Sequence, residues 1–395
     1  MAAATGLVLA GGGARAAYQV GALCAIADIL DPNGRADFPL PFGILCGTSA
    51  GAINAAALAC GASHPRLALR RLRHLWGTLD TSLVYRTDAW GLSRGGGRWL
   101  SMLMLGWLWS AIRQPQPRSL LDNAPLEKLL EATLDFGRLP GHLESGALSA
   151  LAITASGYDS GEHLTFYQAR YAIKPWRRTL RRAVSARIGV QHLMASSAIP
   201  FVFPARPLET GQGREWCGDG SMRQLAPISP AIHLGAQRVL VIGTAFSGGD
   251  THPEQRGQET GHPSLAQIGG QAMATVFLDS ISMDVERLER LNAMLALSPE
   301  AGRALDLRPV RVLALAPSRR LDDLALTHLD SMPPMMRMFL RALGVSTERN
   351  RLSGGTLVSY LLFEAAYTNQ LIELGYTDTM QRIAEVEDFF QESSI

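Results

Sequence analysis

The sequence GILCGTSAGAINAAALAC, residues 43–60, carries the strongest fold signal in the chain. A short apolar run ends at Cys46, a glycine-containing turn follows, and the small residues from Ala50 to Cys60 are typical of a tightly packed helix. A strand, a glycine turn and a helix in succession indicate an α/β protein. We therefore expect the α/β fold class.

The turn within this stretch, GTSAG at residues 47–51, matches the pattern GxSxG between a strand and a helix. That context is the one a nucleophile elbow requires. Gly47 and Gly51 permit a tight turn that lifts the Ser49 hydroxyl out of the backbone, and the helix N-terminus favours developing negative charge. Ser49 is therefore the predicted nucleophile.

The same order of elements occurs at the N-terminus, where the apolar residues 5–10 are followed by Gly11, Gly12 and Gly13 and then by a helical pattern. A dinucleotide loop would need a third glycine where Ala16 stands, and no GK[ST] follows. Consecutive N–H groups at a helix start instead suit an oxyanion hole, worth about 3–4 kcal/mol per well-placed donor. For Arg15, three roles stay open: holding this loop, facing an anionic substrate, or lying on the surface.

A serine nucleophile needs a base, and the candidate is Asp219 in the turn CGDGS, residues 217–221. Gly220 and its neighbours would let this carboxylate approach another loop, and no histidine lies in a convincing strand-end loop. An ordinary Asp, with a pKa near ~3.9, is a weak base, so a Ser–Asp dyad requires a desolvated site. A purely structural Asx turn is the alternative interpretation of Asp219.

These motifs together resemble a known family. GGGARAAYQVG near the N-terminus, GTSAG, ASSAIPFVFPA at residues 195–205 and the Asp219 turn occur in the order seen in patatin-like lipid acyl hydrolases. The four blocks span about residues 5–235, and the sequence resembles a bacterial member of that family.

The resemblance implies a three-layer α/β/α sandwich in which serine and aspartate act without a catalytic histidine. Ser49 would attack an ester carbonyl, Asp219 would serve as general base, and Gly11 to Gly13 would hold the oxyanion. The chain departs from the family at Ser221, where glycine or alanine is usual after Asp-Gly. A positive φ at that position would strain the turn.

Length and composition set the organisation of the chain. Its 395 residues, 47% hydrophobic and with a net charge of +2, predict a folded protein with no global attraction to nucleic acid. We expect a catalytic domain over residues 1–246, a linker at 247–262, and a mostly helical region at 263–395 packed on the catalytic domain. No secretory signal is recognisable, so a cytoplasmic location is expected. No metal cluster, calcium loop or cofactor motif is evident.

Two local segments are candidates for transient membrane-surface contact. Residues 99–112, WLSMLMLGWLWSAI, carry Trp and Met between arginines and would lie in a membrane interface, cover the site, or pack in the core. Residues 174–187 carry one lysine and five arginines that would face anionic headgroups or form a solvated helix face. Either segment would complement a lipid substrate.

The sequence thus predicts a serine esterase acting through an acyl-enzyme on a phospholipid or another acyl-ester lipid, of the phospholipase A or lysophospholipase type. The alternative is a catalytically weak or inactive lipid- or nucleotide-binding module on the same fold, which the glycine loop and Ser221 motivate.

Overall fold

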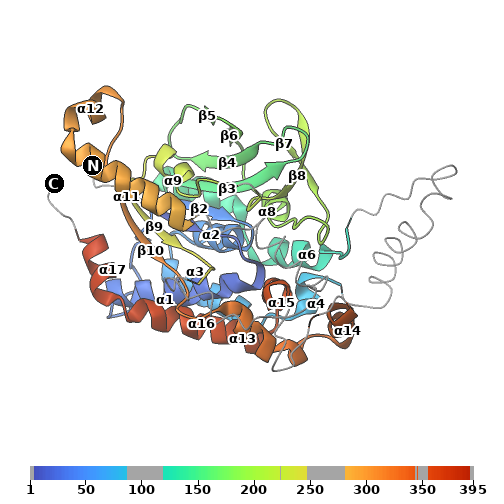
Figure 1. Ribbon diagram of the computed structural model, residues 1–395. Helices are drawn as coiled ribbons and strands as arrows, with labels where there is room; N and C mark the ends of the chain where they lie inside the picture. The colour runs from blue at the N-terminus through green and yellow to red at the C-terminus, as the bar shows by residue number, and fades with distance from the viewer. Residues whose placement is uncertain are drawn as a thin grey trace, which may run out of the picture.

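The computed structural model describes residues 4–86, 119–222, 224–246, 281–342, 345 and 355–391. Strands and helices mix in the N-terminal part, and helices dominate the C-terminal part (Figure 1). The strands are β1 (Thr5–Leu9), β2 (Ile44–Thr48), β3 (Ala150–Gly157), β4 (His163–Ala169), β5 (Arg177–Arg178), β6 (Arg181–Ser185), β7 (Arg206–Glu209), β8 (Arg214–Asp219), β9 (Arg238–Ile242) and β10 (Arg311–Leu315). The helices before β9 are the 3-10 turn η1 (Gly13–Ala16), α1 (Ala17–Leu30), α2 (Ala50–Cys60), α3 (Pro65–Gly77), α4 (Thr81–Val84), α6 (Ala124–Thr133), η2 (Phe136–Arg138), α7 (Leu139–Ser145), α8 (Val190–Ser196) and α9 (Ser229–His233). Those after β9 are α11 (Ile281–Leu297), α12 (Pro299–Ala304), α13 (Leu321–Thr327), η4 (Leu329–Ser331), α14 (Pro334–Ala342), α15 (Gly355–Leu361), α16 (Ala365–Met380) and α17 (Ile383–Phe390).

The strands form one mixed sheet in the order β10-β9-β1-β2-β3-β4-β6-β5, with β8 added to β3 and β7 to β8. The neighbours from β10 to β3 are all parallel. Leu9 at the end of β1 lies level with Gly47 on one side and Ile242 on the other. Because parallel strands end at one edge, the loops after β1, β2 and β9 meet there, which is where α/β sheets bind their ligands.

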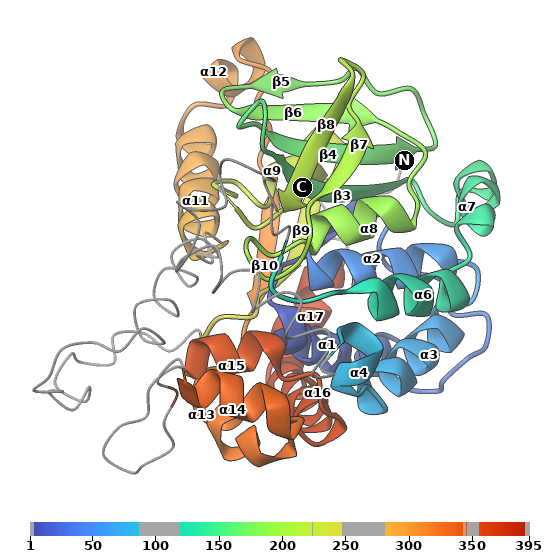
Figure 2. The ribbon, with the colours of Figure 1, turned by 90° about the vertical axis from the view of Figure 1, so that its right-hand side faces the viewer.

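Side chains that alternate along the strands build a core on each face of the sheet. Leu7 and Leu9 point into the larger core, which α1, α2 and α16 cover. Val8 and Val241 point into the opposite core, where α9 and α11 pack. Helices therefore lie on both faces of the sheet (Figures 1 and 2), and the predicted three-layer α/β/α architecture is confirmed.

The C-terminal region is tied to the rest of the fold in two ways. Its strand β10 extends the parallel part of the sheet beside β9. Its helix α16 lies against α1 with backbone contact at two glycines, since a Cβ at Gly21 would collide with the carbonyl of Ile372 and one at Gly375 with that of Tyr18. The domain boundaries stay a prediction, because the predicted linker 247–262 lies outside the described residues, as does the segment 99–112.

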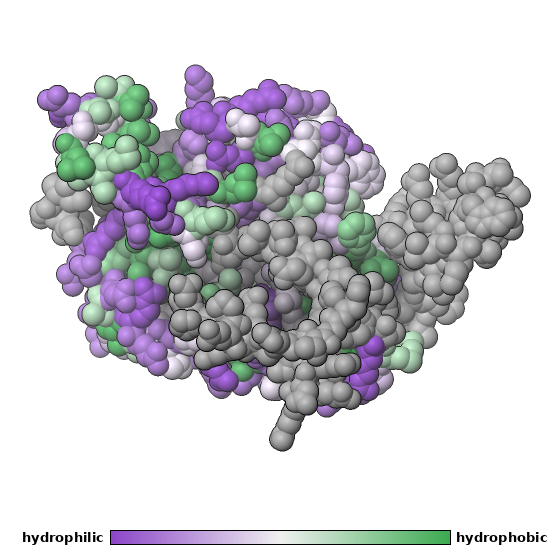
Figure 3. All heavy atoms as spheres, in the orientation of Figure 1, coloured by the Kyte–Doolittle hydropathy of each residue, from purple (hydrophilic) through white to green (hydrophobic). Residues whose placement is uncertain are grey.

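The basic stretch at residues 174–187 is not a helix. It forms the β5–β6 hairpin at the edge of the sheet, so its interpretation as a helix face is wrong. The hairpin is held by Glu162, which accepts hydrogen bonds from Arg182 at 2.6 Å and from Arg177 at 3.1 Å. The surface over this hairpin is mainly hydrophilic (Figure 3).

No helix in the described part of the chain is both long enough and apolar enough to cross a bilayer.

Candidate active site

Ser49 lies at the sharp turn between β2 and α2, with φ 53° and ψ −127°. A positive φ costs a non-glycine residue roughly 1–3 kcal/mol and persists only where the surroundings impose it. Here the Ser49 N–H donates to Ser196 Oγ at 2.8 Å. Both flanking glycines are required for packing, because a Cβ at Gly51 would collide with the carbonyl of Leu9 and one at Gly47 would lie 2.5 Å from Ala52 Cα. The predicted elbow geometry is present.

Asp219, at the end of β8, is fully buried and lies against this serine. Its Oδ2 accepts a hydrogen bond from Ser49 Oγ at 2.6 Å, and its Oδ1 accepts one from the Ser221 N–H at 2.8 Å. Burial disfavours the carboxylate and raises the pKa of Asp219 to about 6, with the two hydrogen bonds opposing the shift. The carboxyl group therefore forms an Asx turn and also reaches the serine, so the two interpretations of this residue are compatible.

The backbone around Asp219 is fixed at both neighbouring positions. Its N–H donates to the carbonyl of Ala198 at 3.0 Å, and the Gly220 N–H donates to the carbonyl of Ser196 at 3.1 Å. A Cβ at Gly220 would collide with the carbonyl of Thr154. Ser221 is not among the described residues with positive φ, so a serine at this position leaves the turn unstrained.

The glycine loop lies beside Ser49 at the start of η1. The Gly11 carbonyl accepts a hydrogen bond from Thr244 Oγ1 at 2.7 Å. A Cβ at Gly11 would lie 3.1 Å from Ser49 Cβ, and one at Gly12 would lie 2.6 Å from Thr244 Oγ1. Gly13 has φ +55°, and a Cβ there would collide with the carbonyl of Tyr360. A Cβ would thus meet side chains at Gly11 and Gly12 and backbone at Gly13, and the contact at Gly11 brings the loop next to the serine.

Arg15 fastens this loop to the C-terminal region. Its guanidinium forms an ion pair with Asp322 on α13, its Nε donates to Ser359 Oγ on α15 at 2.9 Å, and its Cζ lies 4.2 Å from the Tyr360 ring centroid. Ser359 also donates to Asp322 at 2.9 Å. Of the three roles open for Arg15, this geometry matches the first, because the side chain is buried and holds the loop.

We expect Asp322→Ala to lower the thermal stability. Removing one partner of an ion pair that is largely buried leaves the other charge uncompensated, and with Asp322 26% exposed the cost is roughly 2–3 kcal/mol, a fall in Tm of several degrees. Calorimetry measures this fall in Tm. Asp323→Ala is the matched control, because that neighbour is 58% exposed and its pair with Arg320 is worth little. Equal Tm values for the two variants would contradict this role of Asp322.

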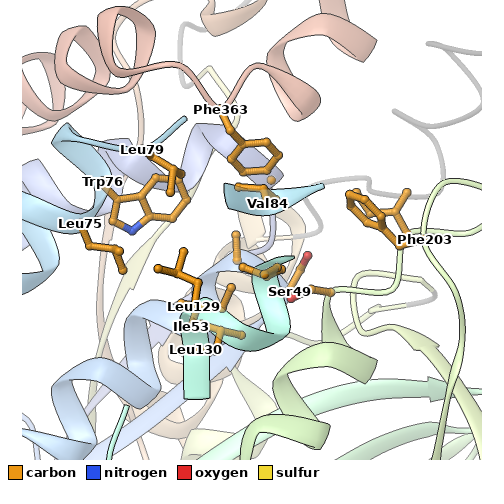
Figure 4. Close-up of a pocket in the computed structure, with 15 residues that line it drawn as sticks. Ser49, Ile53, Leu75, Trp76, Leu79, Val84, Leu129, Leu130, Phe203 and Phe363 are labelled. Carbon is orange, nitrogen blue, oxygen red and sulfur yellow. The ribbon is translucent and has the colours of Figure 1, made fainter. Parts of the chain in front are cut away.

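An apolar cavity adjoins Ser49 (Figure 4). Its volume is about 40 Å³, little more than one water molecule occupies, so an apolar ligand must displace side chains to enter. The residues that line it are Gly13, Ser49, Ala50, Ile53, Leu75, Trp76, Leu79, Val84, Leu126, Leu129, Leu130, Ser197, Ile199, Phe203 and Phe363. Phe363 comes from the segment between α15 and α16, so the C-terminal region contributes to this cavity as well as to the glycine loop.

His163 on β4 is a site residue that sequence reasoning missed. Its Nε2 donates to the carbonyl of Gly220 at 2.9 Å. Burial disfavours the imidazolium and lowers the pKa of His163 to about 4, so the ring is neutral at physiological pH. It supports the Asp219 turn, and among the described residues no histidine is hydrogen-bonded to Ser49 or Asp219. In the sequence, only the strand pattern around His163 could have drawn attention to this residue.

In the described part of the chain, no three His, Cys, Asp or Glu side chains are grouped to hold a metal ion.

Comparisons with known proteins add a family match. A family model described as patatin-like phospholipase matches residues 7–232, which include both Ser49 and Asp219. The sequence matches no curated protein.

Among solved structures, VipD from Legionella pneumophila is 14% identical with a TM-score of 0.37, over 97% of this chain and 67% of that one. The type III effector protein ExoU is 18% identical with a TM-score of 0.28, over 91% of this chain and 77% of that one. ExoU from Pseudomonas aeruginosa in complex with SpcU is 16% identical with a TM-score of 0.25, over 94% and 70% of the two chains. These similarities are loose.

Proposed function

The chain belongs to the patatin-like phospholipase family, and we propose that it is a serine lipid acyl hydrolase of the phospholipase A or lysophospholipase type. The observation that carries the proposal is the 2.6 Å hydrogen bond from Ser49 Oγ to the buried Asp219 Oδ2, beside an apolar cavity. A nucleophile within reach of a base is the arrangement that acyl transfer requires. The substrate class is a phospholipid or another acyl-ester lipid.

In the proposed mechanism, Asp219 accepts the proton of Ser49 as Oγ attacks the ester carbonyl carbon. The N–H groups of Gly11, Gly12 and Gly13 stabilise the oxyanion of the tetrahedral intermediate. The intermediate collapses when the C–O bond to the alcohol breaks, and the alcohol leaves with the proton from Asp219. Water, deprotonated by Asp219, then attacks the acyl-enzyme and releases the fatty acid and Ser49.

The raised pKa of Asp219 makes this base stronger than a solvated aspartate. Its conjugate acid is closer in pKa to neutral pH, so the carboxylate accepts a proton more readily and is still ionised above pH 6. The 0% exposure of the side chain also removes competing water from the Ser49–Asp219 hydrogen bond. The site therefore supplies the desolvation on which a Ser–Asp dyad depends.

We expect kcat/KM for a non-ionising ester to fall about tenfold per pH unit below pH 6, since only the ionised Asp219 can accept the serine proton. Initial rates between pH 4.5 and 8.5, with circular dichroism at each pH to verify folding, measure the profile. A flat profile through pH 6 in folded protein would contradict Asp219 as the base.

The alternative module that binds a lipid or nucleotide without catalysis is less compatible with this site. The cavity beside Ser49 is lined almost entirely by apolar side chains, whereas nucleotide phosphates require polar donors. We further propose a cytoplasmic location and transient membrane-surface contact through residues 99–112 and 174–187. The first of these segments lies outside the described residues.

A further inference from the structure

A second and larger cavity lies between α2, α3, α6 and α7, at the end of α2 that is remote from Ser49. Its volume is about 550 Å³, within the range of roughly 300–1,000 Å³ found for small-molecule sites. The proposed mechanism makes no use of this cavity.

Two leucines border both cavities. Leu75 on α3 and Leu129 on α6 line the pocket beside Ser49 and also the larger cavity. Both are only half-buried, whereas Leu130 and Trp76, which also line the first pocket, are buried. In Figure 4, Leu75 lies at one end of the labelled residues and Phe203 at the other, with Ser49 nearer to Phe203 than to Leu75. The larger cavity therefore adjoins the part of the first pocket that is farther from Ser49.

Helix α2 provides a continuous wall from one cavity to the next. Ser49 at its N-cap and Ile53 line the first pocket, and Ala57 and Gly61 line the second. Each of these residues is four positions from the next, so neighbouring members of the series lie beside each other along the helix. From Ser49 to Gly61 the series rises about 18 Å at 1.5 Å per residue and turns by about 120° around the helix axis. The wall that α2 provides thus passes from the nucleophile to the second cavity.

The side chains that line the second cavity are apolar at its buried wall and polar at its exposed rim. Leu72 is buried at its wall, and Leu75 and Leu129 are half-buried. Arg71 and Arg138 are exposed and form part of its rim. An unbranched hydrocarbon chain arriving from Ser49 would meet apolar side chains first.

We propose that the second cavity binds the distal part of the scissile acyl chain, with Leu75 and Leu129 as the gate between the cavities. The inference rests on the proposed function and adds a selectivity for long acyl chains. Exchange of leucine rotamers is fast compared with catalysis, so the gate opens when a chain enters. Each further methylene that is buried raises kcat/KM roughly fourfold, because its transfer from water is favourable.

The test compares dodecanoyl and butanoyl p-nitrophenyl esters, and the decisive quantity is the ratio of their kcat/KM values. Ala132→Trp fills the cavity from an exposed position on α6, and Ala57→Phe fills it from α2. If a variant excludes only two methylenes of the dodecanoyl chain from the cavity, the dodecanoyl-to-butanoyl ratio of kcat/KM should fall at least about tenfold. We expect this fall in each blocking variant. Ala301→Trp is the matched control, since it places the same side chain on an exposed alanine of α12, and it should keep the wild-type ratio.

Wild-type ratios in both blocking variants would overturn the proposal and leave the cavity with no role in chain binding. Failure of the proposed function would look different, because the wild type would then not hydrolyse even the butanoyl ester, or Ser49→Ala would hydrolyse it equally well. A second readout needs no turnover. Ser49→Ala should bind dodecanoate in calorimetry, and adding Ala132→Trp should weaken that binding at least about tenfold; equal affinities would overturn the proposal.

Discussion

Ser49→Ala is expected to lower kcat for ester hydrolysis by at least about 10⁴-fold, because no other group replaces the nucleophile and the covalent path is lost. The fold should survive this change. Alanine keeps the Cβ and the backbone of the elbow, and only the hydroxyl that donates to Asp219 disappears. Activity is measured with a short-chain ester, and folding is measured by the Tm.

The control for this variant is Ser82→Ala, which removes an exposed hydroxyl on α4. It should retain wild-type kinetics. If Ser49→Ala with a normal Tm retained more than a tenth of the wild-type kcat, Ser49 would not be the nucleophile, and the proposed function would fail with it.

Asp219→Asn has the second largest expected effect, a loss of about 10³–10⁴-fold in kcat, comparable with removal of the acidic member of a catalytic triad. Asparagine has nearly the same shape and can accept from the Ser221 N–H, but it cannot take the proton of Ser49. The dependence of the rate on pH near 6 should disappear with the carboxyl group. The measurement is the kcat/KM profile against pH for wild type and variant.

The raised pKa of Asp219 also determines how Asp219→Asn changes the stability at a given pH. The pKa of Asp219 is about 6 in the folded protein and near ~3.9 unfolded, so the folded state binds more protons between these values. The contribution of this group to stability is therefore present below pH 4 and is lost as pH rises through 6. At pH 8, Asp219→Asn removes a buried charge, and its Tm should equal or exceed that of wild type.

A matched control is Asp159→Asn, which changes an exposed aspartate in the turn after β3. It should leave both the rate and the pH profile unchanged. A marked loss of Tm in Asp219→Asn, with activity lost only in proportion to unfolded protein, would assign Asp219 to structure alone.

The sequence predicted those parts of the site that depend only on residues close together in the chain. The GTSAG turn between an apolar run and a helix specifies the backbone of Ser49, because only glycine fits at the two flanking positions. The order of strands and glycine turns likewise predicted the α/β class. Asp219 was identified as a candidate by its glycine-flanked turn, but its pKa depends on burial, which no local pattern reveals.

The contacts that could not be predicted join distant parts of the chain. Arg15 pairs with Asp322, 307 residues away, and its role was open among three possibilities. The apolar residues of β10 are typical of a strand, yet nothing in their pattern indicates that this strand extends the sheet beside β9. The arginines at 174–187 suggested a helix face, whereas pairing with β4 and buried Glu162 makes them a hairpin. Only at residues 174–187 did tertiary pairing override a local pattern.

Labelling folded protein with a fluorophosphonate and mapping the adduct by mass spectrometry shows whether Ser49 is a nucleophile that Asp219 activates. We expect one adduct, on the peptide that contains Ser49, which is absent from Ser49→Ala and forms far more slowly in Asp219→Asn. An unlabelled Ser49 in folded wild-type protein, or equal labelling rates in wild type and Asp219→Asn, would contradict it.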